Sequence, residues 1–248
     1  MKDYTLGLVS VSFRGHTPRE IMEAAAAAGL SCIEWGSDVH APPSEGARLC
    51  EIAALQAAYG LKASSYGTYF RLGQTPLDEL CSYIRAAEIL GTDTLRLWCG
   101  QKSGADMTKA EREELTALCR AAATMAEAAG VRLCMECHKR TFTENPEDAV
   151  WLMEEVGSPA FSMYWQPFQW QGVSENLANA ARVAPYAHHI HVFHWRGDER
   201  LPLAEATDEW RAYLAAFTTP RTLLLEFMPR DGIRELAAEA DALRRITE

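Results

Sequence analysis

Positive charge and long apolar runs are both scarce in this chain. It has 24 lysines and arginines against 34 aspartates and glutamates, which gives a net charge of −10. A surface that binds nucleic acid neutralises phosphates with a basic face, so this charge argues against a nucleic-acid partner. No apolar run approaches the roughly 20 residues that a membrane-spanning helix needs, which argues against a membrane partner.

Targeting and disulfide signals are also missing. The first residues, MKDYTLGLVSVSF, contain only a brief apolar stretch and no small-residue cleavage pattern. The seven cysteines are an odd number scattered through apolar segments, which is typical of reduced, buried thiols. These features together predict a cytoplasmic protein.

A glycine-rich phosphate turn is absent after the first predicted strand, where the chain reads Ser12-Phe13-Arg14-Gly15-His16. This absence disfavours a doubly wound open sheet that binds a dinucleotide. What the chain does have is a regular alternation of strands and helices. The predicted strands are Thr5–Ser12, Ser31–Trp35, Leu61–Tyr66, Thr94–Trp98, Val131–Cys137, Phe161–Trp165, His189–Phe193 and Thr222–Phe227. The predicted helices include Pro18–Ala28, Gly46–Tyr59, Pro76–Leu90, Lys109–Ala129, Pro146–Val156, Asp208–Phe217 and Ile233–Ile246.

Helix boundary signals support this assignment. Thr17 with Glu20 and Thr108 with Glu111 have the spacing of capping boxes, and glycines follow several of the predicted helices. Alternation of strands and helices implies a parallel sheet. Eight such units in 248 residues predict an α/β fold in which residues 1–248 form one (β/α)8 TIM barrel domain.

Two glutamates end otherwise apolar strands. Glu136 ends the run VRLCME, and Glu226 ends the run TLLLE. An unpaired buried carboxylate is costly, so such a residue usually has a metal, an arginine or a substrate as its partner. The alternative is that each glutamate marks the point where its strand meets water.

A barrel of this kind gathers the carboxyl ends of its strands at one face, where active sites lie. Glu136 and Glu226 would meet there with His191 of the seventh strand and Gln166 after the sixth. Two carboxylates, an imidazole and an amide oxygen can bind one divalent ion such as Mn²⁺, Mg²⁺, Co²⁺ or Zn²⁺. Clusters of histidine and glutamate also occur in sites without a metal.

Tryptophans are concentrated near the same strand ends. Trp98 and Trp165 are predicted to form flat apolar walls that suit the hydrophobic face of a sugar or cyclic polyol. The alternative is that such aromatic side chains only pack the loops over the barrel mouth.

Several short motifs occur along nearly the whole chain, and their order and spacing match those of a known protein family. They are Gly7-Leu8 in the first strand, Ile33-Glu34, Glu136-Cys137-His138, His189-Ile190-His191 and Glu226. In this order and spacing the chain resembles the sugar phosphate isomerase/epimerase group of the xylose isomerase-like TIM barrels, in the superfamily that includes the AP endonucleases.

The resemblance implies one divalent metal ion held by Glu, Asp, His and Glu from strands five to eight. It carries this role onto Glu136, His191 and Glu226. The family's aspartate falls at Gln166, and a family histidine falls at Gln169. Gln166 can still offer an amide oxygen, but it removes one negative charge, so we expect weaker metal binding or loss of the ion.

The resulting hypothesis is an isomerase or epimerase of a small-molecule sugar or polyol that works through a metal-stabilised enediolate. Glu136 and Glu226 would act as general base and acid. The residues expected to hold substrate hydroxyls are His138, Gln169, His194 and Arg196.

Three other functions remain open. They are a keto-polyol dehydratase on the same scaffold, a DNA-repair enzyme, which the acidic charge and Gln166 disfavour, and a non-catalytic sugar-binding barrel that has lost its metal. Barrels of this group often form dimers, so a homodimer is expected by analogy alone.

Overall fold

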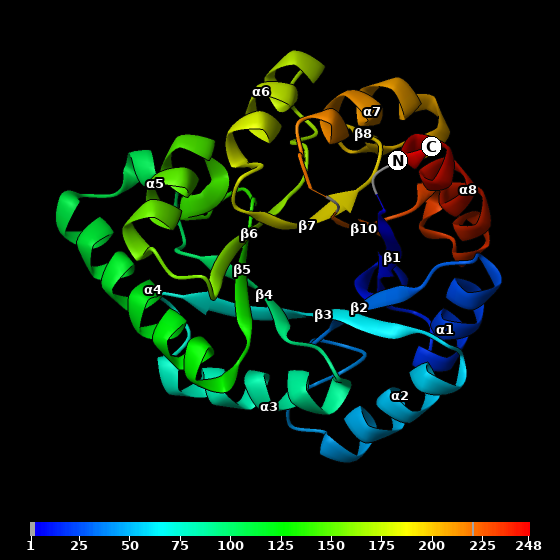
Figure 1. Ribbon diagram of the computed structural model, residues 1–248, viewed down its shortest axis with the longest axis horizontal. Helices are drawn as coiled ribbons and strands as arrows, with labels where there is room; N and C mark the ends of the chain where they lie inside the picture. The colour runs from blue at the N-terminus through cyan, green and yellow to red at the C-terminus, as the bar shows by residue number, and fades with distance from the viewer. Residues whose placement is uncertain (1–2, 220) are drawn as a thin grey trace.

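The protein is a closed parallel barrel surrounded by helices (Figure 1). The computed structural model describes residues 3–219 and 221–248. Neighbouring strands follow the order β1-β10-β7-β6-β5-β4-β3-β2. The barrel strands are β1 (Thr5–Val9), β2 (Cys32–Gly36), β3 (Lys62–Leu72), β4 (Thr94–Cys99), β5 (Arg132–Glu136), β6 (Phe161–Trp165), β7 (Ala187–Val192) and β10 (Thr222–Leu225). Each overlaps a strand predicted from the sequence, so the predicted (β/α)8 barrel is confirmed.

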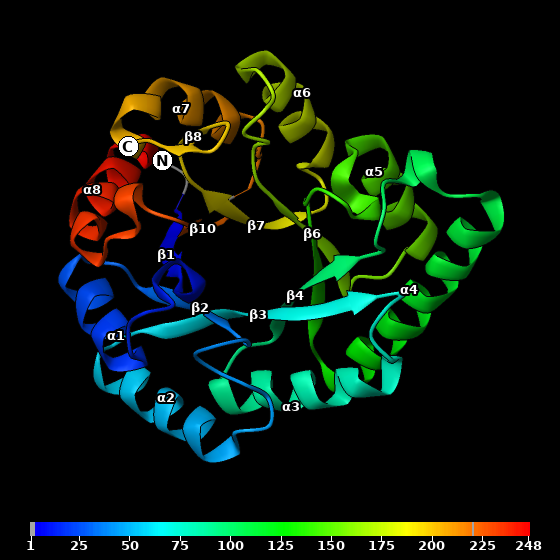
Figure 2. The same ribbon diagram turned by 180° about the vertical axis from the view of Figure 1, so that it is seen from behind.

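Helices pack around the outside of the barrel, as the views from both sides show (Figures 1 and 2). They are α1 (Pro18–Ala27), α2 (Gly46–Ala58), α3 (Leu80–Leu90), α4 (Lys109–Ala129), α5 (Pro146–Val156), α6 (Val173–Val183), α7 (Thr207–Ala215) and α8 (Leu236–Thr247). The capping boxes predicted at Thr17 and Thr108 are both formed. None of the described helices is long and apolar enough to cross a membrane.

Two elements were not predicted. Helix α6 begins after Gly172, which has no side chain to accept a hydrogen bond, so its start carries no capping signal. Strands β8 (Trp195–Arg196) and β9 (Glu199–Arg200) form a small antiparallel hairpin outside the barrel. Two predicted helices also start late, because the 3₁₀ turns Leu77–Glu79 and Ile233–Glu235 precede α3 and α8.

The hydrophobic core has two parts. A large shell fills the space between the strands and the helices, and a smaller cluster inside the barrel includes Val9, Cys134, Tyr164 and Leu224. Apolar side chains usually fill a barrel interior of this type. Here the layer nearer the carboxyl ends of the strands contains buried charged side chains instead. The candidate site lies at this layer.

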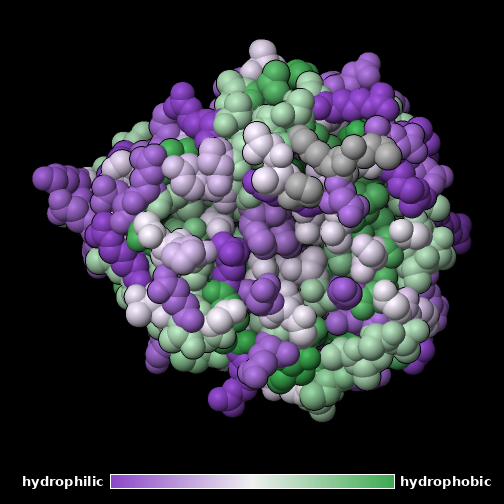
Figure 3. All heavy atoms as spheres, in the orientation of Figure 1, coloured by the Kyte–Doolittle hydropathy of each residue, from purple (hydrophilic) through white to green (hydrophobic). Residues whose placement is uncertain are grey.

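The outer surface has the mixed character of a globular protein. Figure 3 shows hydrophilic side chains around the margin of one face, with separate hydrophobic areas among them. The exposed large hydrophobic residues include Trp170, Val173 and Leu177, which lie in and after the loop that follows β6.

Candidate active site

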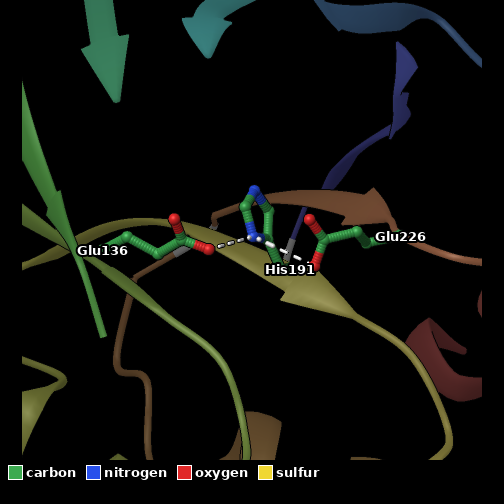
Figure 4. Close-up of side chains that lie close together, drawn as sticks. All are labelled: Glu136, His191 and Glu226. Atoms are coloured by element: carbon green, nitrogen blue, oxygen red, sulfur yellow. Dashed lines mark ion pairs between the residues drawn. The ribbon is translucent and has the colours of Figure 1, made fainter. Parts of the chain in front are cut away.

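Three buried side chains converge at the carboxyl end of the barrel. Glu136 ends β5, His191 lies in β7, and Glu226 directly follows β10. Potential ligand atoms of all three lie within 4.8 Å of one another. His191 Nδ1 is 3.6 Å from Glu136 Oε1 and 3.5 Å from Glu226 Oε2, so the imidazole lies between the two carboxylates (Figure 4).

Gln166 joins this cluster from the loop after β6. Its Oε1 lies 3.0 Å from His191 Nδ1, at hydrogen-bond distance. The structure therefore brings together the four residues that the sequence nominated as metal ligands. They present three oxygen atoms and one nitrogen, which is a donor set that suits a hard or borderline divalent cation.

Arg96 of β4 is the central residue that sequence reasoning missed. Its buried guanidinium donates from Nε to Glu34 Oε1 at 2.9 Å and from Nη1 to Glu136 Oε2 at 2.6 Å. Trp98 Nε1 donates to the same Glu136 Oε2 at 2.5 Å. Because Oε2 is held from two sides, Glu136 turns its other oxygen, Oε1, toward His191.

Glu34 of β2 lies on the opposite side of the imidazole. Its Oε2 accepts a hydrogen bond from Ser65 Oγ at 2.9 Å and lies 3.6 Å from His191 Nε2. A side chain at Gly67 would collide with this pair, because an added Cβ would lie 2.5 Å from Glu34 Oε1 and 3.0 Å from Arg96 Nη2. The glycine therefore makes room for the ion pair of Glu34 and Arg96.

The buried charges shift one another's pKa values. Burial alone would raise the pKa of Glu136, but the Arg96 guanidinium and His191 outweigh it and lower that pKa to about 2. Burial raises the pKa of Glu226 to about 7, although His191 partly opposes the shift. Burial would lower the pKa of His191, yet the Glu226 and Glu34 carboxylates raise it to about 10.

The charge balance of the cluster fits a divalent ion. In the metal-free protein the raised pKa values of His191 and Glu226 keep protons in the cluster. Once both groups have lost these protons, the three ionised glutamates (Glu34, Glu136 and Glu226) and the Arg96 cation leave a net charge of −2. One divalent cation would neutralise that charge. His191 Nδ1 faces the ligand group while Nε2 faces Glu34, which is the arrangement in which a carboxylate orients a metal-binding histidine.

An open cavity of about 240 Å³ lies above the cluster. Arg96, Glu136, Gln166 and Glu226 reach its floor. Its walls are mainly aromatic and include Tyr69, Trp98, Phe168, Trp170, Trp195 and Phe227. Apolar walls with a few convergent polar groups are typical of a small-molecule site.

Three of the predicted substrate residues line this cavity, namely Trp98, His138 and Gln169. The rings of Trp98 and His138 lie 5.0 Å apart, so they form one side of the mouth. Trp170 also lines the cavity, as do Lys139 and Phe227, which the sequence had not singled out as substrate residues.

The prediction for Trp165 was wrong. Its side chain is 1% exposed and its ring packs against Trp210, Tyr213 and Phe217 on the helix side of the sheet. Alternation along β6 explains this, because Tyr164 points into the barrel and the next residue must therefore point outward.

His194 and Arg196 also lie away from the cavity. His194 is buried, with its Nδ1 3.0 Å from the carbonyl oxygen of Pro202, and Arg196 is exposed and pairs with Glu209. Strand β7 ends at Val192, and the chain then enters the β8–β9 hairpin. The alternation of β7 therefore does not extend to these two residues.

Comparison with solved structures finds the same fold at low sequence identity. The probable 3-DHS dehydratase AsbF of Bacillus anthracis, involved in petrobactin synthesis, has a TM-score of 0.82 and 18% identity, over 98% of this chain and 99% of that one. A xylose isomerase-like TIM barrel protein from Mycobacterium smegmatis in complex with magnesium has a TM-score of 0.72 and 16% identity, over 98% and 97%. An L-ribulose 3-epimerase has a TM-score of 0.73 and 16% identity, over 98% and 93%.

A comparison with curated protein sequences gives no significant match. The sequence profile of one protein family, described as xylose isomerase-like TIM barrel, matches residues 22–246. This match spans most of the chain and includes each of the four clustered residues. The chain belongs to the xylose isomerase-like TIM barrel family.

Proposed function

We propose that this protein is a metal-dependent isomerase or epimerase that moves a proton at a carbon atom next to a carbonyl group of a sugar or polyol. The observation that carries the proposal is the cluster of Glu136, His191 and Glu226, whose two carboxylates line the floor of an aromatic-walled cavity with His191 buried between them. Structural similarity to an L-ribulose 3-epimerase supports the choice of substrate class.

One divalent ion would be held by Glu136, Gln166, His191 and Glu226. A bound divalent ion supplies a Lewis acid that polarises a carbonyl oxygen. The similar Mycobacterium smegmatis protein in complex with magnesium supports this part of the proposal. Arg96 and Trp98 would keep one oxygen of Glu136 occupied, which leaves the other oxygen free to act as a ligand.

Glu226 is the better proton acceptor of the two glutamates. A general base works best when its pKa is near the working pH, and in the metal-free protein burial raises the pKa of Glu226 to about 7 while that of Glu136 is lowered to about 2. Glu136 is kept ionised by Arg96, so it has no proton to donate and would serve as a ligand of the ion. In an isomerisation, the protonated Glu226 would itself return the proton to the neighbouring carbon.

A dehydratase of a keto-polyol is the second candidate. The similarity to the probable 3-DHS dehydratase favours it, because the two folds match over nearly the full length of both chains. Loss of water would begin with the same abstraction of a proton by Glu226. The protonated carboxyl could then return that proton to the departing hydroxyl group.

Incubation in deuterium oxide with a panel of keto-sugars and keto-polyols tests both activities. NMR would show exchange of a C–H next to the carbonyl for an isomerase or epimerase, and formation of an unsaturated product for a dehydratase. The variant Glu226→Gln should lose either signal. Glu239→Gln is the matched control, because Glu239 is also a buried carboxyl with a pKa of about 7 but accepts its hydrogen bonds from Leu203 N, outside the cavity.

The third possibility is a sugar-binding barrel without catalysis. Metal analysis after incubation with Mn²⁺ separates it from the two enzymes. Near-stoichiometric metal that disappears in a Glu136→Gln variant supports the proposed function. Metal well below one equivalent, together with the absence of C–H exchange, would favour a protein that only binds its ligand.

A further inference from the structure

The rim of the cavity is positively charged on one side, although the chain as a whole is acidic. Directly after Glu136 the sequence continues Cys137-His138-Lys139-Arg140, and His138 and Lys139 of this segment line the cavity. We propose that the substrate carries an anionic group, a carboxylate or a phosphate, which pairs with the ammonium group of Lys139. This inference rests on the proposed function, since it names the class of substrate for the same cavity.

Lys139 is held in the wall of the cavity by an aromatic side chain. Its Nζ lies 4.2 Å from the centre of the Trp170 ring, and both residues line the cavity. No carboxylate among the described residues lies within ion-pair distance of Nζ. A cation–π contact fixes the position of an ammonium group without neutralising its charge. The charge of Lys139 is therefore available to a ligand.

The neighbouring arginines add to the positive charge. Arg71 stacks on Trp98, with its Cζ 4.6 Å from the ring, and donates from Nη1 to the carbonyl oxygens of Gly100 and Arg140. Neither Arg71 nor Arg140 has a carboxylate ion pair among the described residues. The nearby Glu144 carboxylate accepts a hydrogen bond from the Arg140 backbone N–H instead.

Of the two lysine and arginine side chains that line the cavity, Lys139 is the one without a carboxylate partner among the described residues. Arg96 on the floor is already paired with two carboxylates. The opposite wall contains the apolar surfaces of Phe193, Trp195 and Phe227, and Arg200 packs on the Trp195 and Phe227 rings without lining the cavity. A substrate with one anionic end would therefore bind in a single orientation, with that end at Lys139 and its carbonyl end on the carboxylate floor.

The alternative is that Lys139 is an ordinary solvated surface lysine. Both interpretations allow the contact with Trp170, but only the proposed one makes ligand binding depend on ligand charge. Three ligands of similar size test this: D-glucitol, which is neutral, D-gluconate, which has a carboxylate, and D-glucitol 6-phosphate. Binding to the intact protein supplied with Mn²⁺ can be followed through tryptophan fluorescence, because Trp170 and Trp98 line the cavity.

We expect at least one anionic ligand to bind about fivefold to tenfold more tightly than glucitol, and we expect added salt to reduce that preference. Lys139→Gln should reduce the ratio of the anionic-ligand affinity to the glucitol affinity to about one, and Lys139→Arg should retain most of the preference. Lys62→Gln is the matched control, because Lys62 is exposed at the start of β3, the opposite end of the barrel. The comparison of gluconate with glucitol 6-phosphate identifies which anionic group is preferred.

Equal binding of charged and neutral ligands, or no binding of any of the three, would overturn the inference. A charge preference that persists in Lys139→Gln would overturn it as well. The result is separate from the proposed function, because binding is measured without turnover. A protein that shows the preference but no C–H exchange would keep this inference and lose the proposed isomerase.

Discussion

Replacement of Arg96 by methionine should destabilise this protein more than any change on its surface. The guanidinium is buried and joins Glu34 of β2 to Glu136 of β5 through hydrogen bonds of 2.9 Å and 2.6 Å. Methionine fills a similar volume but leaves both carboxylates buried without their cation. Breaking a buried ion pair by removing one partner costs roughly 3–5 kcal/mol.

The loss can be measured by urea denaturation of the metal-free protein, so that metal binding does not add to the stability. A second variant separates charge from packing. In the Arg96→Met background, Glu34→Gln removes one of the two unpaired carboxylates and should recover about 1–2 kcal/mol of the unfolding free energy. The same Glu34→Gln change alone should destabilise the protein, because it weakens an intact pair.

Two results would refute this reasoning. If Arg96→Met lowers the unfolding free energy by less than about 1 kcal/mol, the network does not contribute to stability as a buried ion pair should. If Glu34→Gln has the same effect in both backgrounds, the two residues are not coupled energetically. Arg120→Met is a suitable control, because Arg120 forms an ion pair with Glu155 that is about half exposed and should cost about 0–1 kcal/mol.

Three further changes should have distinct effects. Gly67→Ala should lower stability by about 1–3 kcal/mol in urea denaturation, because its Cβ would press on the Glu34 carboxylate; an unchanged midpoint would contradict this. Burial raises the folded-state pKa of Glu239 to about 7, so ionisation of this carboxyl destabilises the folded protein as the pH rises. Between about pH 4.5 and pH 7 the unfolding free energy of the wild type should fall by about 2 kcal/mol relative to that of Glu239→Gln, as measured by urea denaturation across that range. Gln166→Asp should bind Mn²⁺ at least about tenfold more tightly in metal titrations, because it adds a carboxylate ligand; weaker binding would remove residue 166 from the ligand set.

The barrel itself could be predicted because its signals are local. Most strands are short and largely apolar, although β3 has 11 residues and β7 contains three histidines, and several helices begin or end with a recognisable cap. Helix α6 escaped prediction because Gly172 precedes it and its sequence, VSENLANAARV, has small and polar residues among its apolar positions. Secondary structure was therefore missed where the local signals were weakest.

The site could be predicted only in part, because its residues meet through the topology of the barrel. Glu136, His191 and Glu226 each stand near the end of a strand, where chemistry is expected, and that expectation required only the fold. Arg96 is 62 residues from Glu34 and 40 residues from Glu136 in sequence, and its pairing depends on the strand order, in which β4 lies beside β5 and is separated from β2 by β3 alone. Nothing in the run TLRLWC says which carboxylates an inward-facing arginine will meet.

The arginine also changes what Gln166 means. Taken alone, a glutamine at the position of a family aspartate suggests a weakened metal site. The structure adds Glu34 and Arg96 to the cluster, and with a neutral His191 the total charge of −2 matches a divalent ion without a further carboxylate. An aspartate at position 166 would leave one negative charge in excess. The glutamine is thus compatible with a metal site, at the expense of affinity.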